Sequence, residues 1–537
     1  MEITDETRRG GAFYTPPLLA EAFGLYIDRA LGDGWEWNPS VRVWDMAAGT
    51  GNLEAALPDA ILPRTHLSTL LPKDAAACKR RYPDAHCFAL DFLNDGPERM
   101  PAELVADLAD PSLRWLVLVN PPYATAQDMS REVGKESRDG VSMTTARRSM
   151  TEEGYGNASQ ELFVQFLWRI HRIFKGRHAH LALVSKVKYL NSDRERPVRD
   201  GFFRYTFKGG FVADSRAFAG VKGAFPVGFA VWDMADESPL EGQEVVFNVL
   251  DGAAFPIGTK RFETRRRQTL NKWCPRPPRT GENGFRYPKF SSAFVPREPV
   301  NGKWGLAANG FVAGIASKGD DFQNRGAVAI LSTPHHTQGE FSVTPANFDR
   351  AMALFAVKRI PRGTWLNDRD LFYAPEREPD RQFYDDCTIW TAFSRDNGCA
   401  SFKGLNYGGA VWSIPNGMFP FPAAEVLAWL AENPHGTAVE AVPDSFLARR
   451  LAGRTLSPEA SAVMETGREA FREFWTAAPP SALAEGRIAR TDAGLVQVKR
   501  ASAGMPAVQS ALARLKEAEK LLADSLEPRI RSLGFLA

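Results

Sequence analysis

The stretch WLVLVNPPY, residues 115–123, decides the fold class of this chain. Its uninterrupted apolar run is typical of a strand that is buried on both faces of a parallel sheet. The strand ends before Pro121, because two consecutive prolines lack the N–H groups that a sheet requires. The Asn120 amide, a backbone carbonyl and the Tyr123 ring should therefore lie at the carboxyl edge of the sheet, where open α/β sheets bind ligands. Two hydrogen-bond acceptors beside a ring suit an exocyclic amino group on a flat base.

An earlier stretch, VRVWDMAAGTGNL at residues 41–53, predicts a strand, a tight glycine turn and a helix. Gly49 and Gly51 let the backbone turn sharply and come close to a ligand. Asp45, at the end of the strand, can accept a hydrogen bond from a cationic or hydroxyl group of that ligand. The stretch lacks the third glycine of the dinucleotide fingerprint and the Lys-Ser/Thr of a P-loop. Taken alone, it fits an ordinary strand-to-helix turn equally well.

Two further elements extend the pattern. Residues 10–17, GGAFYTPP, precede an amphipathic stretch, and we expect Thr15 to cap the helix that follows. Residues 86–92, HCFALDF, predict a strand that ends in Asp91 and Phe92. An acid beside a ring can hydrogen-bond and sandwich a purine.

In this order, the four elements resemble those of the amino-methylating, S-adenosylmethionine-dependent DNA methyltransferases, specifically adenine-N6 enzymes of the γ motif order. In that family Phe-Tyr-Thr-Pro comes first, followed by Asp-x-Ala-x-Gly-x-Gly, then Asp-Phe, then Asn-Pro-Pro-Tyr. The resemblance covers roughly the first half of the chain and becomes vague beyond about residue 240.

The resemblance implies S-adenosylmethionine as the cofactor and a catalytic motif formed by Asn120, Pro121, Pro122 and Tyr123. The residues that match the cofactor motifs of the family are Phe13, Tyr14, Thr15, Pro16, Asp45, Ala47, Gly49, Gly51, Asp91, Phe92 and Asn120.

One position departs from the family pattern. The second strand of the family usually ends in an acid that holds the ribose hydroxyls, but residues 66–74, HLSTLLPKD, have no acid at the strand end. Asp74 is better placed as the N-cap of the following helix. We therefore expect the hydroxyl of Ser68 or Thr69, or backbone groups, to replace the acid, and Thr69 joins the candidate cofactor residues.

The implied chemistry is the methylation of an adenine amine, whose lone pair is delocalised into the ring. The Asn120 Oδ1 atom and the Pro121 carbonyl would accept the two amine hydrogens, so that catalysis is largely orientation and electrostatics. The base must be flipped out of the duplex, and Tyr123 would stack on it. In related enzymes a second aromatic residue stacks on the base; Phe218 and Phe225 are candidates here, although core packing explains either ring as well.

Composition describes an ordinary soluble globular protein. The 537 residues are 44% hydrophobic and 24% charged, which suggests two or three domains. The sequence has no apolar run long enough to cross a membrane, and its first residues are polar. The five cysteines show no metal-ligand spacing, and their odd number favours a reducing compartment. We expect a cytoplasmic protein without a structural metal.

The net charge of +2 does not by itself indicate a nucleic-acid partner, but basic residues cluster locally. A polar stretch at residues 124–158 has little apolar periodicity and is expected to be a long loop that becomes ordered against DNA. Charge clusters are usually solvated surfaces; beside a base-modifying site, phosphate contact is the better explanation. The candidate DNA-binding residues are Arg147, Arg148, Lys186, Lys188, Arg265, Arg266 and Arg267.

These patterns predict a Rossmann-like α/β methyltransferase sheet with a terminal antiparallel hairpin in a catalytic domain at residues 1–250. A mixed, β-rich target-recognition domain is expected at residues 251–445 and a helical region at residues 446–537. The last helix has an apolar stripe that most simply packs on its own domain, although a dimer interface is the alternative. Double-stranded DNA is the expected partner of a monomer or homodimer.

Two other functions remain open at this stage. Asn-Pro-Pro-Tyr also serves amino-methylation of RNA and of release factors, although those enzymes are typically smaller. A DNA-binding specificity protein that has lost turnover is the other alternative. A bifunctional restriction–modification enzyme is less expected, because few residues precede Phe13 and no persuasive nuclease motif is found.

Overall fold

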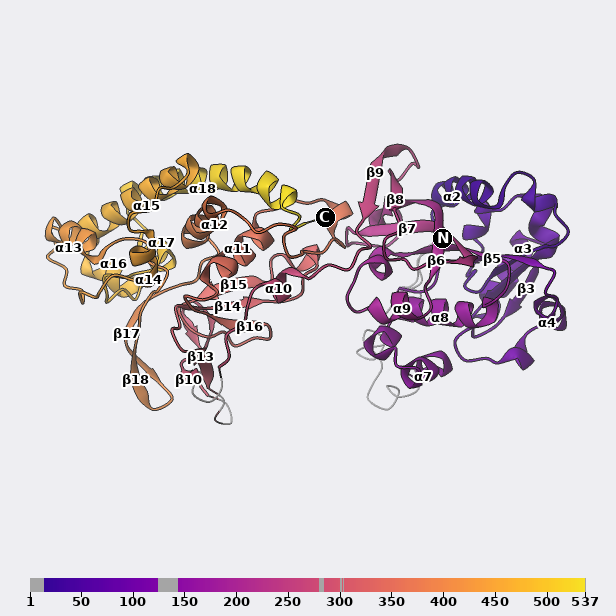
Figure 1. Cartoon of the computed structure of the whole chain (residues 1–537), viewed down its shortest axis with the longest axis horizontal. Helices are drawn as coiled ribbons and strands as arrows, with labels where there is room; N and C mark the ends of the chain where they lie inside the picture. Colours follow the sequence, from indigo (N-terminus) through magenta and orange to yellow (C-terminus); the bar gives the residue numbers. More distant parts are fainter. Residues whose placement is uncertain (1–13, 124–142, 280–283, 300–301, 303, 537) are drawn as a thin grey trace. The chain divides into compact units, whose positions relative to one another are not determined.

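The computed structural model describes residues 14–123, 143–279, 284–299, 302 and 304–536 (Figure 1). Contacts divide the chain into two compact units. The first comprises Met1–Arg266 together with Gly363–Asp370, and the second comprises Arg267–Arg362 together with Leu371–Ala537.

The first unit is built on a nine-stranded sheet with the order β3-β2-β1-β4-β5-β7-β6-β8-β9. Strands β1 to β5 are parallel, and β7 is antiparallel to both β5 and β6. The strands are β1 (Val41–Asp45), β2 (Thr65–Thr69), β3 (His86–Ala89), β4 (Arg114–Val119), β5 (Ala179–Lys186), β6 (Tyr205–Asp214), β7 (Pro226–Glu237), β8 (Val245–Leu250) and β9 (Pro256–Phe262). The expected α/β fold with a parallel-rich central sheet is therefore confirmed.

The antiparallel pair formed by β6 and β7 is present but is not terminal, so this part of the prediction was wrong. Strand β8 pairs in parallel with β6, and β9 pairs antiparallel with β8. Two added strands cover the edge that β6 would otherwise expose, which removes an open row of backbone donors and acceptors.

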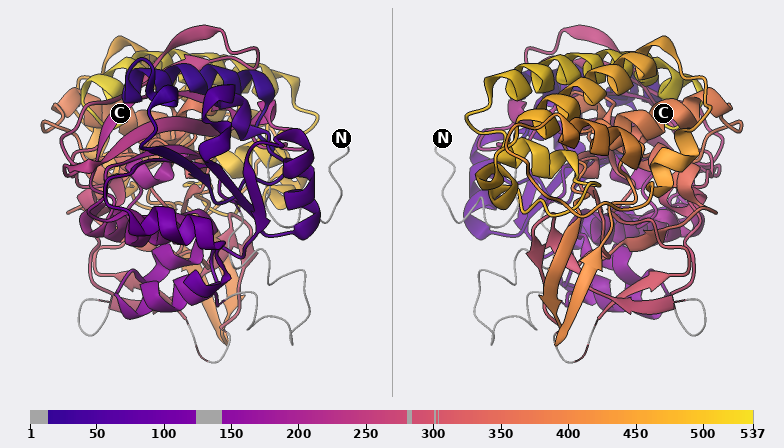
Figure 2. Two further views of the ribbon diagram at one scale, coloured as in Figure 1. Left: turned by 90° about the vertical axis from the view of Figure 1, so that its right-hand side faces the viewer. Right: turned by 90° about the vertical axis from the view of Figure 1, so that its left-hand side faces the viewer.

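Helices cover both faces of this sheet, with α2 on one face and α8 on the other (Figures 1 and 2). Strand β4 shows why: Leu116 and Leu118 pack with α2, whereas Val117 and Val119 pack with α8. A strand that is apolar on both sides must be covered on both sides. The helices of this unit are α2 (Pro17–Leu31), α3 (Pro72–Arg81), α4 (Ala102–Ala109), α7 (Thr145–Glu152), α8 (Leu162–Phe174) and α9 (Arg196–Gly201), with short 3₁₀ turns η1 (Trp35–Trp37), η2 (Leu53–Ala56), η3 (Asp59–Arg64), η4 (Pro97–Arg99), η6 (Gly156–Gln160), η7 (Val187–Leu190), η8 (Ser215–Ala217) and η11 (Trp365–Asn367).

The second unit combines short antiparallel strands with helices. Its strands are β10 (Gly284–Tyr287), β11 (Phe290–Ser292), β12 (Val295–Pro296), β13 (Gly305–Ala308), β14 (Ala313–Ser317), β15 (Val328–Leu331), β16 (Glu340–Val343), β17 (Phe402–Tyr407) and β18 (Ala410–Ile414). Its helices are α10 (Leu270–Trp273), α11 (Phe348–Arg359), α12 (Arg381–Phe393), α13 (Ala423–Ala431), α14 (Phe446–Leu451), α15 (Pro458–Ala477), α16 (Pro480–Glu485), α17 (Leu495–Ala501) and α18 (Pro506–Ser532), with the 3₁₀ turn η10 (Phe322–Asn324).

One hydrophobic core extends through this second unit, from Leu270 to Leu536. It includes residues from both stretches that the sequence suggested as separate domains, 251–445 and 446–537. The apolar stripe of α18, with Val508, Leu515 and Leu522, is buried in this core. The stripe therefore packs within its own unit. Among the helices that the structure describes, none combines the length and the apolar character that crossing a membrane requires.

Candidate functional site at the carboxyl edge of the sheet

The register of the parallel strands brings several candidate residues to one edge of the sheet. Asp45, Thr69 and Lys186 are the last residues of β1, β2 and β5. Asn120 directly follows β4, and Asp91 lies just beyond β3. Because the strands run in parallel, their carboxyl ends meet at the same edge.

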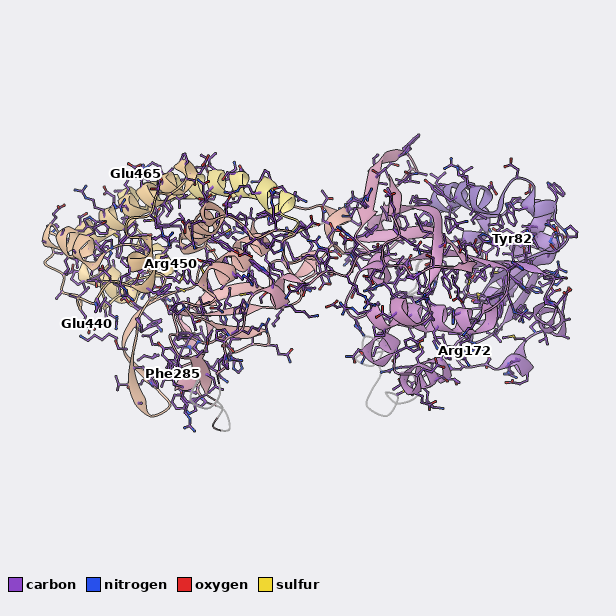
Figure 3. The ribbon with its side chains drawn as sticks, viewed as in Figure 1. Tyr82, Arg172, Phe285, Glu440, Arg450 and Glu465 are labelled. Carbon is purple, nitrogen blue, oxygen red and sulfur yellow. The ribbon has the colours of Figure 1, made fainter. Side chains whose placement is uncertain are left out.

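The glycine turn after β1 depends on a left-handed backbone. Gly49 has φ 58° and Gly51 has φ 81°, which side chains other than glycine rarely adopt. Tyr82, which directly follows α3 and is labelled in Figure 3, donates from its hydroxyl to the Gly51 carbonyl at 3.0 Å. A Cβ atom on Gly51 would lie 2.8 Å from the Tyr82 ring, so the ring fixes the turn.

The N-terminal element lies against this turn. The Tyr14 ring is 3.7 Å from the position that a Cβ atom on Gly49 would occupy. Pro16 is the N-cap of α2 and Pro17 its first residue, and no side chain caps the helix. The expected Thr15 cap is therefore wrong. Phe13 lies outside the described residues.

Thr15 instead holds the catalytic candidate. Its side chain is buried, and its hydroxyl accepts a hydrogen bond of 3.0 Å from Asn120 Nδ2. This bond joins residues far apart in sequence and fixes the plane of the Asn120 amide. With Nδ2 directed to Thr15, Oδ1 is the end of the amide that can accept from a ligand.

The Pro-Pro-Tyr corner is held by a lysine. Lys186 donates from Nζ to the Tyr123 carbonyl at 2.9 Å, and its ammonium lies 5.6 Å from the centre of the Tyr123 ring. The Tyr123 side chain is only 5% exposed and packs with the cluster beneath α2. Pro121 is buried and Pro122 partly buried. Lys186, predicted to bind DNA, is therefore engaged in supporting the motif.

Asp45 and Glu54 form a buried acidic pair beside the glycine turn. Each is 1% exposed, and the Ala47 N–H donates to Asp45 Oδ1 at 2.6 Å. Asp45 Oδ2 and both carboxylate oxygens of Glu54 accept no hydrogen bond from any other described residue. Burial, with the nearby charge of Glu54, raises the pKa of Asp45, and burial raises the pKa of Glu54. Sequence reasoning missed Glu54, although it directly follows the glycine stretch.

The two candidates for ribose contact differ in availability. The Ser68 hydroxyl accepts from Trp44 Nε1 at 3.0 Å and donates to the Asp45 carbonyl at 3.3 Å. It is fully buried. Thr69, at the strand end, is 5% exposed, and among the described residues its hydroxyl has no such internal partner. Thr69 is therefore the better candidate.

Asp91 is hydrogen-bonded to neighbouring residues of the chain, and Phe92 packs in the hydrophobic core. Asp91 Oδ1 accepts from the Leu93 N–H at 3.1 Å and Oδ2 from Asn94 Nδ2 at 2.8 Å, which closes the turn after β3. The Phe92 ring is 2% exposed and meets Trp44 edge to face at 5.8 Å between centroids. Phe92 is thus placed in the core and not as an exposed stacking surface.

Helix α7 begins within the stretch that the sequence suggested as a loop, so the loop prediction is wrong for residues 145–152. Thr144 caps it by accepting from the Arg147 N–H at 3.0 Å. The Arg147 side chain is partly buried and that of Arg148 is exposed. Of these two candidates for DNA contact, Arg148 is the more accessible.

Lys188 and Arg267 make their contacts with other groups of the protein. Lys188 Nζ lies 2.7 Å from Glu161, a carboxylate that is 2% exposed. Arg267 donates to the backbone carbonyls of Ala374 and Gly534 at 3.0 and 2.6 Å within the second unit. Contact of either residue with phosphate stays a prediction, and it would require these side chains to exchange their present partners.

Arg265 and Arg266 are exposed, but their carboxylate partners differ in burial. Arg265 lies 2.7 Å from Glu263, which is 10% exposed, whereas Arg266 pairs with exposed Asp200 and, at 2.8 Å, with exposed Glu241. Exposed pairs such as those of Arg266 contribute about 0–1 kcal/mol, so a phosphate can compete more readily for Arg266 than for Arg265.

The two aromatic candidates of the β6–β7 connection are now distinguishable. Phe218 is 1% exposed and packs in the core with Phe229. Phe225 is partly exposed, and the Arg369 guanidinium lies 5.4 Å from its ring centre. Lys186 pairs with Val227, so Phe225 lies at the same edge as the Pro-Pro-Tyr corner.

Comparison with known proteins gives partial structural likeness only. No family model matches the chain, and no curated protein does. A modification subunit of a putative type I restriction enzyme from Vibrio vulnificus is 13% identical, with a TM-score of 0.30 over 48% of this chain and 50% of that one. A type I restriction–modification methyltransferase subunit from Streptococcus thermophilus is 14% identical, with a TM-score of 0.29 over 48% and 51%. The type IIG restriction endonuclease BpuSI is 14% identical, with a TM-score of 0.31 over 48% and 32%. The match thus spans about half or less of each of these proteins.

The buried acidic pair predicts a pH-dependent stability. Because the folded pair retains protons that unfolded carboxyls release above about pH 4, its contribution to stability falls as pH rises, by about 1.4 kcal/mol per pH unit for each retained proton. Glu54→Gln should flatten this decline between about pH 5 and pH 8 in thermal unfolding. The same change at Glu21, exposed on α2, should leave the profile as in the wild type. Parallel profiles for wild type and Glu54→Gln would contradict the prediction.

Proposed function

We propose that this chain is an S-adenosylmethionine-dependent methyltransferase that methylates the N6 amine of an adenine flipped out of double-stranded DNA. The observation that carries the proposal is the position of Asn120. Its amide is oriented by Thr15 at 3.0 Å, and it stands at the same sheet edge as the Asp45 glycine turn. An amide acceptor at the same edge as this left-handed glycine turn supports the proposal.

The residues at the turn fit the cofactor. The buried, orphaned Asp45 Oδ2 atom needs a donor or a cation. Left-handed Gly49 and Gly51 keep the backbone free of side chains, and Thr69 offers a hydroxyl at the next strand end. When bound, S-adenosylmethionine would supply a methyl group on a cationic sulfur.

The protein residues would act on the amine. Asn120 Oδ1 and the Pro121 carbonyl accept its two hydrogens, which favours a pyramidal nitrogen with an available lone pair. Because both acceptors are fixed before the base arrives, little reorganisation is needed during the reaction. No covalent enzyme intermediate is required.

Aromatic contacts would offset the cost of flipping the base. Flipping costs a few kcal/mol, and stacking on one ring returns about 1–3 kcal/mol. Tyr123 is largely covered and packs with its own core, so Phe225, which is partly exposed at the same edge, is the second stacking residue in this proposal. Exposed Arg148, Arg265 and Arg266 are the proposed phosphate contacts.

Transfer of a radiolabelled methyl group tests the function directly. The full chain should label duplex DNA in preference to RNA or to a release factor. Label in RNA or protein would identify one of the alternative amino-methyltransferases. Binding of DNA without any transfer would identify a specificity protein that has lost turnover.

Asn120→Ala should abolish methyl transfer, because the amine loses its side-chain acceptor, while DNA affinity in a binding titration stays within about twofold of wild type. Asn38→Ala is the matched control. Asn38 lies before β1, at the opposite end of the strands, and its Oδ1 accepts from Ser40. Full activity of Asn120→Ala on duplex DNA would defeat the assignment.

Thr15→Val should lower kcat by about tenfold to a hundredfold without a matching change in the affinity for DNA, because Asn120 loses the acceptor that orients it. Thr15→Ser keeps a hydroxyl and should restore most of the rate. Equal rates for the valine and serine variants would show that the hydrogen bond to Asn120 has no role in turnover.

Thr69→Val should weaken S-adenosylmethionine binding in a calorimetric titration by about fivefold to tenfold, the effect of one lost hydrogen bond. Thr69→Ser should bind close to wild type. Unchanged affinity in Thr69→Val would remove this hydroxyl from the cofactor site.

A further inference from the structure

The proposed function does not explain why two carboxyl groups, Asp45 and Glu54, are buried side by side at the glycine turn. Asp45 ends β1 and Glu54 lies in η2, so the pair brackets the turn from both sides. Three of its four carboxylate oxygens accept nothing from other described residues, namely Asp45 Oδ2 and both Glu54 oxygens. Both residues are 1% exposed. Buried carboxylates in this condition require a proton or a cation.

The surrounding elements do not supply that cation to the pair. From α3, Arg81 is exposed and directs its guanidinium to Asn52 Oδ1 at 2.7 Å, although its charge lowers the pKa of Glu54 to some extent. The Cys78 thiol donates to the Gly49 carbonyl at 3.1 Å. The other titratable groups that face the pair or its neighbours include one cation, Lys79, which acts on Cys87 and donates to the backbone carbonyls of Pro83 and Ala85. The remaining groups are acidic or neutral: Asp59, Asp74, Tyr14, Tyr82 and Cys87.

Without a ligand, the pair therefore holds a proton. Two ionised carboxylates side by side in a buried site repel each other, and one shared proton removes most of that cost. Both pKa shifts agree with a proton held by the pair, because burial raises the pKa of Asp45 and of Glu54.

We propose that Asp45 and Glu54 together receive the α-ammonium group of the methionine part of S-adenosylmethionine, and that the pair releases its proton to solvent when this ammonium binds. The inference rests on the proposed cofactor and goes beyond it by assigning Glu54 and a proton-coupled step. An ammonium group has three N–H donors, and the pair offers three orphaned acceptors.

The exchange balances in atoms and charge. The O–H bond of the protonated carboxyl breaks, and the proton passes to the buffer. The ammonium keeps its three hydrogens and takes over the neutralising charge. No oxidant, reductant or further reactant takes part.

Proton coupling makes the site selective for a charged amino group. As pH rises toward neutral, the pair is more ionised before binding, so fewer protons are released and the affinity for the cation is higher; above about pH 8 the ligand's α-ammonium group loses its own proton and this gain ends. A nucleoside that lacks the amino-acid part, such as 5′-methylthioadenosine, should bind without releasing a proton.

Isothermal titration of the full chain in two buffers of different ionisation enthalpy tests this directly. Wild type should release protons on binding S-adenosylmethionine between about pH 6 and pH 7, and this number should fall as pH approaches about 7.5, below the range in which the ligand's own α-amino group, with a pKa of about 7.7–8.0, loses its proton. Glu54→Gln, whose amide cannot carry the titrating proton, should release clearly less and bind about tenfold to a hundredfold more weakly. Glu21→Gln should behave as wild type.

The ligand comparison in wild type does not depend on how well a variant folds. Release of the same number of protons with 5′-methylthioadenosine as with S-adenosylmethionine would overturn the inference, as would equal release by wild type and Glu54→Gln. Binding of S-adenosylmethionine without the proposed linkage leaves the proposed function intact. If wild type binds no S-adenosylmethionine at all, the proposed function falls as well.

Discussion

The end of β4 is the constraint on which the site depends. Pro121 and Pro122 cannot donate to a sheet, so the central strand stops directly after its most buried residues. The next polar groups must then be satisfied by other elements. Thr15 holds the Asn120 amide and Lys186 holds the Tyr123 carbonyl. A strand terminus is thereby converted into a rigid corner with defined acceptors.

The same edge carries an electrostatic cost. An ordinary folded core would not keep two adjacent carboxyls buried without donors, because replacing them by apolar groups would stabilise it. Asp45 and Glu54 are nevertheless buried beside the left-handed glycine turn, with three carboxylate oxygens that accept no hydrogen bond from other described residues. Sites that are strained or poorly satisfied without a ligand are typical of binding sites, where the ligand supplies the missing partner. The burial of this pair thus supports binding more than it supports stability.

Sequence reasoning succeeded where one local rule decides the outcome. The apolar run before Asn120, the proline stop and the left-handed Gly49 and Gly51 each follow from backbone sterics. It failed where tertiary contacts compete with a local preference. Thr15 is a good cap by residue type, but its hydroxyl accepts from Asn120. Phe92 matches a motif, but its ring completes the core against Trp44.

Charge patterns were the least informative part of the sequence, for a physical reason. Clustering along the chain does not show which cations have carboxylates opposite them in the fold. Lys188 meets a buried carboxylate of Glu161 and Arg265 meets the largely covered Glu263, whereas Arg266 meets exposed carboxylates. Screening by solvent leaves the exposed pairs weak, so only they can exchange partners at little cost.

The first unit is also not a continuous segment of the chain. Gly363–Asp370 belongs to it although it lies far along the sequence. Trp365 packs on its core, and Asp370 pairs with Lys260 at 2.7 Å. Between them in sequence, the Arg369 guanidinium lies 5.4 Å from the centre of the Phe225 ring. The sequence of this segment does not show that it belongs to the first unit, because its contacts are with residues more than a hundred positions earlier, such as Lys260 of β9 and Asn191. Phe225, the ring proposed to stack on the flipped base, is therefore contacted by the segment Gly363–Asp370. The sequence of the N-terminal half alone could not predict this contact.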